Sequence, residues 1–248
     1  MAKIRLADIS TLPPKKTDKN KIIAATEKLI VQLDELQNLL YAQSKYAILI
    51  VIQGMDAAGK DGAIRHVFGK LNPQGVQVTS FKEPTALELS HDFLWRIHQH
   101  TPARGMIHIF NRSHYEDVLV TRVHKLINNK LAFKRMDAIN DFERLLVEHN
   151  HTHILKFYLH ISHKEQLKRL DERIKDPQKQ WKYNEKDFEE SKLWPEYMEV
   201  YEDCLNNCNE VPWIITPSDA HWYKEYIIAK NLYELLSGLK MQYPGLKK

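Results

Sequence analysis

The sequence predicts a three-layer α/β/α fold with a parallel sheet of roughly five strands. Short apolar, β-branched runs alternate along the chain with longer amphipathic segments, and charged loops follow several of the runs. Alternating strands and helices imply parallel strands that are joined by right-handed crossovers. The chain has 248 residues, 43% of them hydrophobic, which suits a single domain with a full core.

The ends of the chain are expected to lie outside this domain. Residues 1–18 carry Pro13, Pro14 and several lysines without periodicity, which indicates an N-terminal arm. We expect one domain over 19–240 and a short C-terminal tail over 241–248. No internal repeat, low-complexity tract or long linker divides the predicted domain.

Each predicted element follows from the spacing of its apolar residues. Those of 21–40 recur every three or four residues, as in an amphipathic helix, whereas YAILIVI is continuously apolar, as in a strand buried on both faces. The predicted strands are 46–52, 76–81, 106–110, 153–161 and 212–216. The predicted helices are 21–40, 60–71, 86–100, 114–127, about 135–149, 163–207 with a polar interruption at 175–184, and 219–238.

The loop after the first strand has the spacing of a phosphate-binding loop. GMDAAGKDG (54–62) fits G-x-x-x-x-G-K, in which backbone N–H groups surround an anion and the lysine reaches its oxygens. The alternative is an ordinary glycine-containing turn with Lys60 on a solvated face. The candidate phosphate-binding residues of the loop are Gly54, Met55, Ala57, Ala58, Gly59, Lys60, Asp61 and Gly62.

Two carboxylates in this loop are unexpected in an anion site. Asp56 would repel a phosphate unless a cation lay between them, and Mg²⁺ takes ligands from one or two carboxylates and from substrate phosphates. Asp61 stands where Ser or Thr normally follows the lysine. It could serve the metal too, or only favour the helix dipole. Asp56 is therefore the stronger candidate metal ligand.

Two more strand ends carry polar residues, and ligands bind at such ends in open parallel sheets. FKEPT follows the second strand and contributes Lys82 as a candidate phosphate ligand. FNRSHYED follows the third strand, where Arg112 could clamp a phosphoryl group or only form a salt bridge with Glu83 or Asp117. The further candidate metal ligands at this end are Asn111, Glu116 and Asp117.

A basic segment near 168–190 is a candidate lid. Arg169 and Arg173 lie four residues apart on one helix face, Lys175 follows, and a polar segment interrupts the helix. Such a charge run is either a solvated face or a lid that closes over a phosphate-rich substrate.

Bulk properties exclude other classes of protein. The formal charge of +4 is well below that of a histone-like binder, so no nucleic-acid partner is expected. Cys204 and Cys208, at helical spacing, suggest neither a disulfide framework nor zinc. The N-terminus lacks a signal-peptide core, and YAILIVI is too short to cross a bilayer. We expect a cytoplasmic protein without a membrane partner.

Taken together, these motifs resemble the polyphosphate kinase 2 family. GMDAAGKDG, FKEPT, FNRSHYEDVLV, DPQKQWKYNEKDFEESKLWPEY and VPWIITPSDAHWY occur in the family's order over roughly 45–225. The resemblance implies a P-loop kinase fold with a lid. It also implies Mg²⁺, with Mn²⁺ as a substitute, and reversible transfer of phosphoryl groups between inorganic polyphosphate and nucleotides.

By motif position, the resemblance makes Asp56 a metal ligand beside the reacting groups, and Lys60 and Arg112 phosphoryl clamps. It places Arg169, Arg173 and Lys175 in the lid. The chain looks like the family's third class, which acts on nucleoside mono- and diphosphates such as AMP, ADP, GMP and GDP. Family members often self-associate, so we expect a homodimer or homotetramer.

The chain departs from the family pattern at two positions. Asn111 stands where many members have Asp, so Glu116 or Asp117 would take over part of the metal role. His221 stands where lysine is common, which leaves its role open.

Two other functions remain open at this point. One is an ATP-dependent nucleoside monophosphate kinase that resembles thymidylate kinase, against which Asp56 and the missing Ser or Thr after Lys60 count. The other is a non-catalytic polyanion-binding protein, which the modest charge disfavours.

Overall fold

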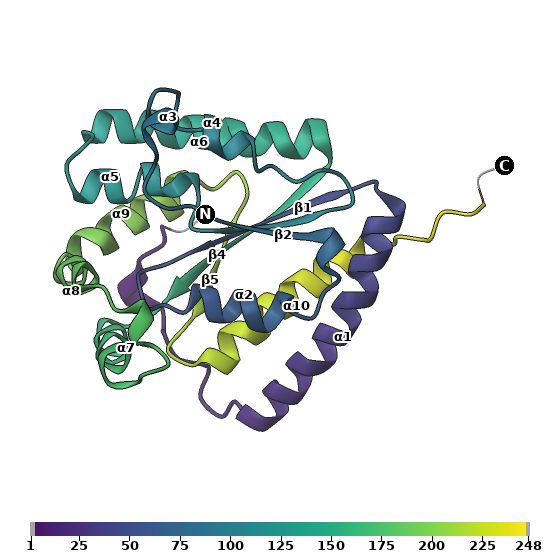
Figure 1. The fold of residues 1–248 in the computed structure, drawn as a ribbon, viewed down its shortest axis with the longest axis horizontal. Helices are drawn as coiled ribbons and strands as arrows, with labels where there is room; N and C mark the ends of the chain where they lie inside the picture. Colours follow the sequence, from purple (N-terminus) through teal and green to yellow (C-terminus); the bar gives the residue numbers. More distant parts are fainter. Residues whose placement is uncertain (1–2, 247–248) are drawn as a thin grey trace.

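The computed structural model describes residues 3–246 and has a parallel five-stranded sheet at its centre (Figure 1). The strand order is β2-β3-β1-β4-β5, and every neighbouring pair is parallel. The predicted fold class is confirmed. The strands are β1 (Ala47–Gln53), β2 (Val76–Ser80), β3 (Ile107–Asn111), β4 (Thr152–His160) and β5 (Trp213–Pro217).

Helices cover both faces of the sheet (Figure 1). One layer holds α1 (Lys19–Gln43), α2 (Lys60–Phe68) and α10 (His221–Gly238). The other layer holds α3 (Ala86–Leu89), α4 (Trp95–His98), α5 (Val120–Val123), α6 (Asn129–Asn150) and α9 (Trp194–Asn207). The helices α7 (His163–Lys175) and α8 (Glu185–Lys192) lie together beyond one end of the sheet. Within the described residues, four 3₁₀ turns complete the order: η1 (Leu6–Asp8), η2 (Pro73–Gly75), η3 (His114–Asp117) and η4 (Gln180–Lys182).

The central strand β1 is buried on both faces of the sheet. All seven of its residues are buried, and it pairs with β3 on one side and β4 on the other. A parallel strand covered by helices on both faces needs a continuous apolar run rather than an alternating one. The apolar run 46–52 therefore predicted the central strand with an error of one residue at each end.

Three predicted helices differ in extent from those of the structure. The segment 86–100 forms two one-turn helices, α3 and α4, because the Thr85–Glu88 capping box starts a turn while Ser90 and Asp92 bond to nearby backbone groups and end it. The segment 114–127 is a 3₁₀ turn followed by the short α5. Helix α6 begins at Asn129 rather than near 135, because the Asn128 side chain caps it.

Residues 4–12 pack against the domain. The backbone of Ile4 bonds to Asn206, Leu6 is 2% exposed, and its N–H donates to Glu202 on α9. Residues 1–2 of the predicted arm and 247–248 of the predicted tail lie outside the described part of the chain. The division into arm, domain and tail stays a prediction.

A buried ion pair lies between α6 and β4. Lys156 Nζ is 2.7 Å from Glu143 Oε2, and both side chains are fully buried. The same ammonium donates to Tyr115 Oη at 2.8 Å and to the Cys208 carbonyl at 3.0 Å, and Tyr115 donates to Glu143. Because Tyr115 belongs to η3, this network fixes the segment that follows Arg112.

We expect Lys156→Met to lower the free energy of unfolding by roughly 3–5 kcal/mol, because it leaves the Glu143 carboxylate buried without its cation. Urea denaturation of the purified variant measures this change. The matched control is Lys192→Met, which removes an exposed pair with Glu189 and is expected to change stability by less than ~0.5 kcal/mol. Equal stabilities of the two variants would contradict the role given to the buried network.

Candidate active site

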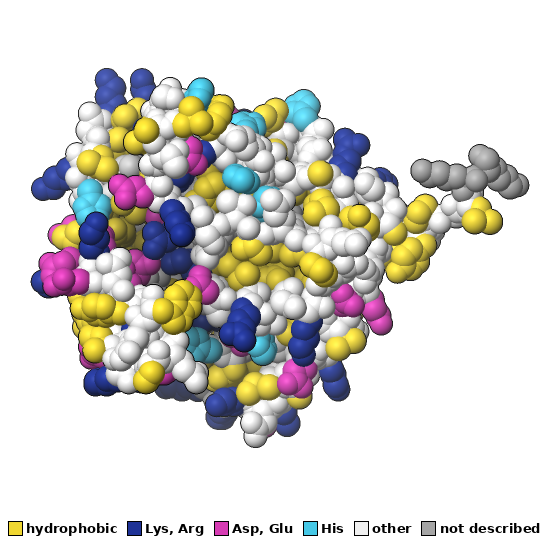
Figure 2. All heavy atoms as spheres, in the orientation of Figure 1, with side chains coloured by type: hydrophobic (Ala, Val, Ile, Leu, Met, Phe, Trp, Pro, Cys, Tyr) yellow, Lys and Arg dark blue, Asp and Glu magenta, His cyan; other side chains and the backbone are white. Residues whose placement is uncertain are grey.

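A cleft of about 700 Å³ opens at the carboxyl ends of β1, β2 and β3. Its walls are the loop 54–59 with the start of α2, the strand ends, α7, the segment 176–184 and the start of α10. Basic and acidic side chains mix on the side of the molecule that carries α7 and α8 (Figure 2). Seven Lys or Arg residues and four Asp or Glu residues line the cleft, so it suits an anion: Lys60, Lys82, Arg112, Arg169, Arg173, Lys179 and Lys182, against Asp56, Asp61, Glu83 and Glu172.

The carbonyl oxygens of the loop 54–58 are all held by side chains. Lys60 Nζ donates to those of Gly54 at 2.7 Å and Met55 at 3.2 Å. Gln166 on α7 donates to the carbonyl of Asp56 at 3.1 Å. The remaining two carbonyls accept from the Arg169 guanidinium, at 3.1 Å for Ala57 and 3.2 Å for Ala58.

The N–H groups of the same loop are available for a ligand. Among residues 3–246, those of Asp56, Ala57 and Gly59 donate to no protein acceptor. Gly59 and Ala57 adopt left-handed conformations, with φ of 93° and 61°, and α2 begins directly after Gly59. Free N–H groups that precede a helix N-terminus form an anion-binding concavity.

Asp56 forms an ion pair with Arg112. The distance between Arg112 Nη2 and Asp56 Oδ1 is 2.6 Å, and neither side chain is fully buried. Burial alone would raise the pKa of Asp56, but the charges of Lys60 and Arg112 outweigh burial and hold that pKa below its usual value. Asp56 is therefore ionised near neutral pH. The sequence left open a salt bridge from Arg112 to Glu83 or Asp117. In the structure the partner of Arg112 is Asp56 instead.

The backbone of Arg112 is strained. Its φ of 62° is left-handed, although the residue has a side chain, and its N–H donates to the Ile52 carbonyl at 3.1 Å. Such a conformation costs about 1–3 kcal/mol and persists only where the surrounding structure enforces it. The β1–β3 pairing on one side and the Tyr115 network on the other enforce it here, and the guanidinium then reaches Asp56.

The predicted metal ligands do not come together as one cluster. Asn111 donates to Asp61 at 2.9 Å, and Asp61 also accepts from Lys182 at 2.9 Å. Burial raises the pKa of Glu116, and it raises that of Asp117 to about 6 despite Arg96 and Arg135 nearby. Neither Glu116 nor Asp117 lines the cleft.

The donor set nevertheless fits Mg²⁺. Within residues 3–246 no three His, Cys, Asp or Glu side chains are arranged to hold a metal ion by themselves. Mg²⁺ does not need such a cage, because it keeps several waters and shares one or two carboxylates with substrate phosphates. Asp56 and Asp61, on either side of Gly59 and both facing the cleft, supply carboxylates of this kind.

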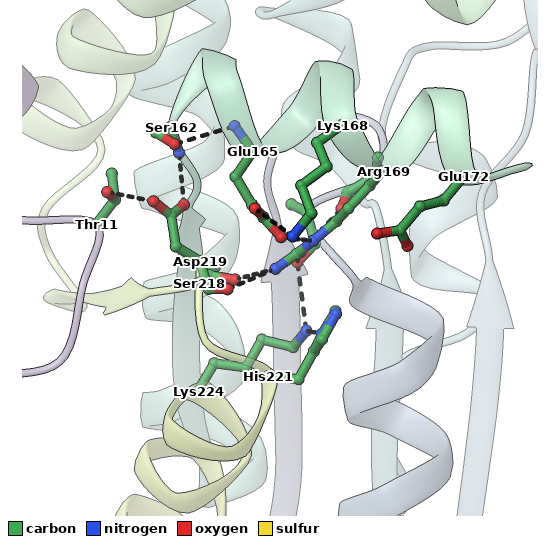
Figure 3. A network of polar contacts seen from close by, with 12 residues as sticks. Thr11, Ser162, Glu165, Lys168, Arg169, Glu172, Ser218, Asp219, His221 and Lys224 are labelled. Atoms are coloured by element: carbon green, nitrogen blue, oxygen red, sulfur yellow. Dashed lines mark hydrogen bonds and ion pairs between the residues drawn. The ribbon is translucent and has the colours of Figure 1, made fainter. Parts of the chain in front are cut away.

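The predicted lid residues differ in their surroundings. Arg169 is 7% exposed, and its five N–H groups bond to Glu165 and to the carbonyls of Ala57, Ala58, Ser218 and Asp219 (Figure 3). This arrangement favours a positioning role for Arg169. Arg173 pairs with Asp187, whereas Lys175 is exposed and does not line the cleft. Lys179 and Lys182 line it instead.

Asp219 joins three segments next to Arg169. Its carboxylate accepts from Thr11 Oγ1 and from the Ser162 N–H, each at 2.8 Å, while its carbonyl accepts from Arg169 (Figure 3). His160 at the end of β4 contacts the Ile9 carbonyl at 3.1 Å. The N-terminal segment is thereby tied to the residues that hold the phosphate loop.

Lys224 was missed by the sequence analysis. Its side chain is fully buried, and its Nζ lies 3.4 Å from the Ala58 carbonyl and 2.8 Å from His221 Nδ1 (Figure 3). A lysine inside an otherwise apolar helix face was the available signal. Gln166 was missed too, since a glutamine in a charged helix carries no such signal.

Comparisons with known proteins agree on one family. A sequence model described as polyphosphate kinase 2 (PPK2) matches residues 16–244. An AMP/ADP-polyphosphate phosphotransferase from Meiothermus ruber is 48% identical over 226 residues, which are 89% of this chain and 84% of the relative. An ADP-polyphosphate phosphotransferase from Rhodopseudomonas palustris is 44% identical over 229 residues, 87% of this chain and 79% of the relative.

A solved structure has the same fold. The crystal structure of polyphosphate kinase 2 from Arthrobacter aurescens TC1 matches with a TM-score of 0.96 and 39% sequence identity. The match covers all of this chain and 90% of that one.

We expect Gly59→Ala to destabilise the protein by roughly 1–3 kcal/mol, because the residue is left-handed and an added Cβ would lie 2.2 Å from Lys224 Nζ. The matched control is Gly62→Ala in the same helix, where an added Cβ meets nothing within 4 Å. That change is expected to stabilise by about 0.4–1 kcal/mol. Denaturant unfolding of both variants checks the difference, and equal effects would contradict the close contact.

Proposed function

Since this chain belongs to the polyphosphate kinase 2 family, we propose that it transfers phosphoryl groups between inorganic polyphosphate and nucleoside mono- and diphosphates. The acceptors in this proposal are AMP, ADP, GMP and GDP, as in the family's third class. The names of the Meiothermus and Rhodopseudomonas relatives, which mention AMP/ADP and ADP, support it. The reaction is reversible, because one phosphoanhydride bond replaces another.

One observation in the site carries the proposal. The loop 54–59 turns its carbonyl groups onto side chains behind it and leaves N–H groups free, in a cleft where cations outnumber carboxylates. Such a cleft can hold two polyanions end to end only if their charges are offset. Lys60, Arg112 and Lys182 offer cations on different walls.

In the reaction, the terminal phosphoryl group leaves polyphosphate and joins an oxygen of the nucleotide's terminal phosphate. The broken P–O bond leaves its oxygen on the shortened polyphosphate. Lys60 and Arg112 stabilise the charge on the equatorial oxygens, and the loop N–H groups hold the phosphate in line. Both residues line the cleft in the free protein, where Lys60 bonds to the carbonyls of Gly54 and Met55 and Arg112 pairs with Asp56. They exchange these partners for phosphate oxygens when the ligand binds.

Asp56 and Asp61 are the proposed ligands of Mg²⁺, for which Mn²⁺ can substitute. When bound, the ion would offset the negative charge between donor and acceptor phosphates. The Asp56–Arg112 pair supports this assignment, because the depressed pKa of Asp56 keeps its carboxylate ionised and able to bind a cation. Glu116 is half-buried and Asp117 lies 3.8 Å from Arg135, and neither lines the cleft, so both are weaker candidate metal ligands than the sequence predicts.

The comparisons favour this function over the two alternatives that the sequence left open. The relatives described above are named as polyphosphate phosphotransferases, rather than as thymidylate kinases or binding proteins. No helix within residues 3–246 is long and apolar enough to cross a membrane. A cytoplasmic location and a homo-oligomeric state remain parts of the proposal.

We expect ATP to form when the protein is mixed with polyphosphate, Mg²⁺ and either AMP or ADP. A luciferase assay without added ATP measures this directly. Chelation with EDTA is expected to abolish turnover, and excess Mg²⁺ to restore it. Formation of ATP from ADP alone would remove the third-class assignment, and no transfer from polyphosphate to any of the four acceptors would remove the proposed function.

Arg112→Lys is expected to lower kcat by about 100-fold, because lysine keeps the charge but loses the paired donors of the guanidinium. Steady-state kinetics with polyphosphate and ADP test this. The matched control is Arg144→Lys on α6, whose partners Asp141 and Glu210 are exposed, and its kcat is expected to stay within about twofold of the parent. A similar kcat for both variants would show that Arg112 does not contact the reacting phosphoryl group.

A further inference from the structure

His221 and Lys224 form a hydrogen-bonded pair on the first turn of α10, directly behind the phosphate loop (Figure 3). Lys224 Nζ lies 2.8 Å from His221 Nδ1. Both side chains touch the position of Gly59, because a Cβ built there would be 2.2 Å from Lys224 Nζ and 3.4 Å from His221 Nδ1. The pair is thus adjacent to the glycine that precedes Lys60.

The contact determines which nitrogen of His221 carries the proton. A lysine ammonium has donors and no acceptor, so His221 Nδ1 must be the acceptor, and a neutral ring then carries its proton on Nε2. Burial, and after it the charges of Lys224 and Arg169, lower the pKa of His221 to about 4, so the ring is neutral at pH 7.

Charged groups from three helices surround Lys224. Lys60 on α2 and Arg169 on α7 repel its ammonium, whereas Glu225 on α10 attracts it. Burial, followed by Arg169, lowers the pKa of Lys224 to about 8, so most of the molecules carry the ammonium at pH 7. At this pH the charged lysine and the neutral histidine coexist, as the hydrogen bond requires.

The other ring nitrogen of His221 is directed away from Lys224 (Figure 3), and His221 is one of the residues that line the cleft. Glu172 and Lys179 also lie near the ring, but they bond to each other at 3.1 Å. The Nε2–H group is therefore an oriented donor in the space next to the loop N–H groups.

We propose that His221 is a phosphate-binding residue that donates its Nε2–H to a phosphoryl oxygen at the loop, and that Lys224 is the positioning residue that fixes this tautomer. The inference rests on the proposed function for the identity of the phosphate. Because the buried ammonium polarises the ring, the donor is stronger than that of an isolated imidazole.

The tautomer can be measured without turnover. Long-range ¹H–¹⁵N NMR spectra at pH 7 are expected to show the His221 ring with its proton on Nε2, and the His221→Gln spectrum assigns the signal by its disappearance. In Lys224→Met, whose new side chain has a similar length but no hydrogen-bond donor, we expect a mixture of tautomers. A proton on Nδ1 in the parent protein, or an unchanged ring in Lys224→Met, would overturn the assignment.

Binding of inorganic tripolyphosphate, followed by calorimetry, tests the contact itself. His221→Phe is expected to weaken binding by about 10-fold, as the loss of one hydrogen bond would do, and His221→Gln to recover most of that loss through its amide N–H. The matched control His149→Phe lies at the exposed end of α6 and is expected to bind like the parent. Equal affinities of His221→Phe and His149→Phe would overturn the inference.

Kinetics then identify which phosphate His221 holds. A KM for polyphosphate that rises by about 10-fold in His221→Phe, with a smaller change in kcat, supports the contact and places the donor at the loop. A rise of about 10-fold in the KM for ADP instead also supports the contact, and it places the nucleotide's phosphate at the loop. Unchanged KM values for both substrates would overturn the inference. A parent protein that binds tripolyphosphate through His221 but transfers no phosphoryl group would contradict the proposed function alone.

Discussion

The candidate site depends on the side chains that bond to the carbonyl groups of the phosphate loop and so fix its conformation. A glycine-containing loop is flexible, and its carbonyl groups would repel an anion if they turned into the cleft. Side chains from α7 and α10 prevent this, with Arg169, Gln166 and Lys224 bonding to the carbonyls of residues 56–58. The loop N–H groups are thereby directed at the ligand before it binds, and the entropic cost of ordering them is met during folding.

This arrangement explains the two carboxylates in a site built for anions. Several cations gather around the loop, and without counter-charges they would repel one another in the free protein. Asp56 pairs with Arg112, and Asp61 with Lys182, so each carboxylate connects the loop to a different wall of the cleft. In the proposed function, phosphates and a divalent cation that arrive together would exchange these partners without leaving any charge unpaired. The carboxylates therefore stabilise the free state and also remain available to the ligand.

The sequence predicted the features that depend on local pattern. The strands, their order along the chain and the position of the loop between β1 and α2 all follow from apolar runs and from the spacing of Gly54, Gly59 and Lys60. Contacts between distant residues leave no such pattern. The carbonyls of the loop and of Ser218, which accept hydrogen bonds from Arg169, are far away along the chain, so the sequence shows only that Arg169 belongs to a basic helix. The segment 86–100 looked helical because periodicity does not register the competing side-chain bonds of Ser90 and Asp92.

The position of residues 9–12 has a practical consequence for anyone who attaches this protein to a surface or joins it to another domain. Thr11 and Ile9 bond to Asp219 and His160, at the edge of the site, whereas Tyr243 and Leu246 are exposed in a segment that extends away from the body (Figure 1). A linker that pulls on the first dozen residues would strain Asp219 and, through Arg169, the loop. A linker joined at the other end of the chain would pull first on the exposed segment that holds Tyr243 and Leu246, so that end is the better point of attachment.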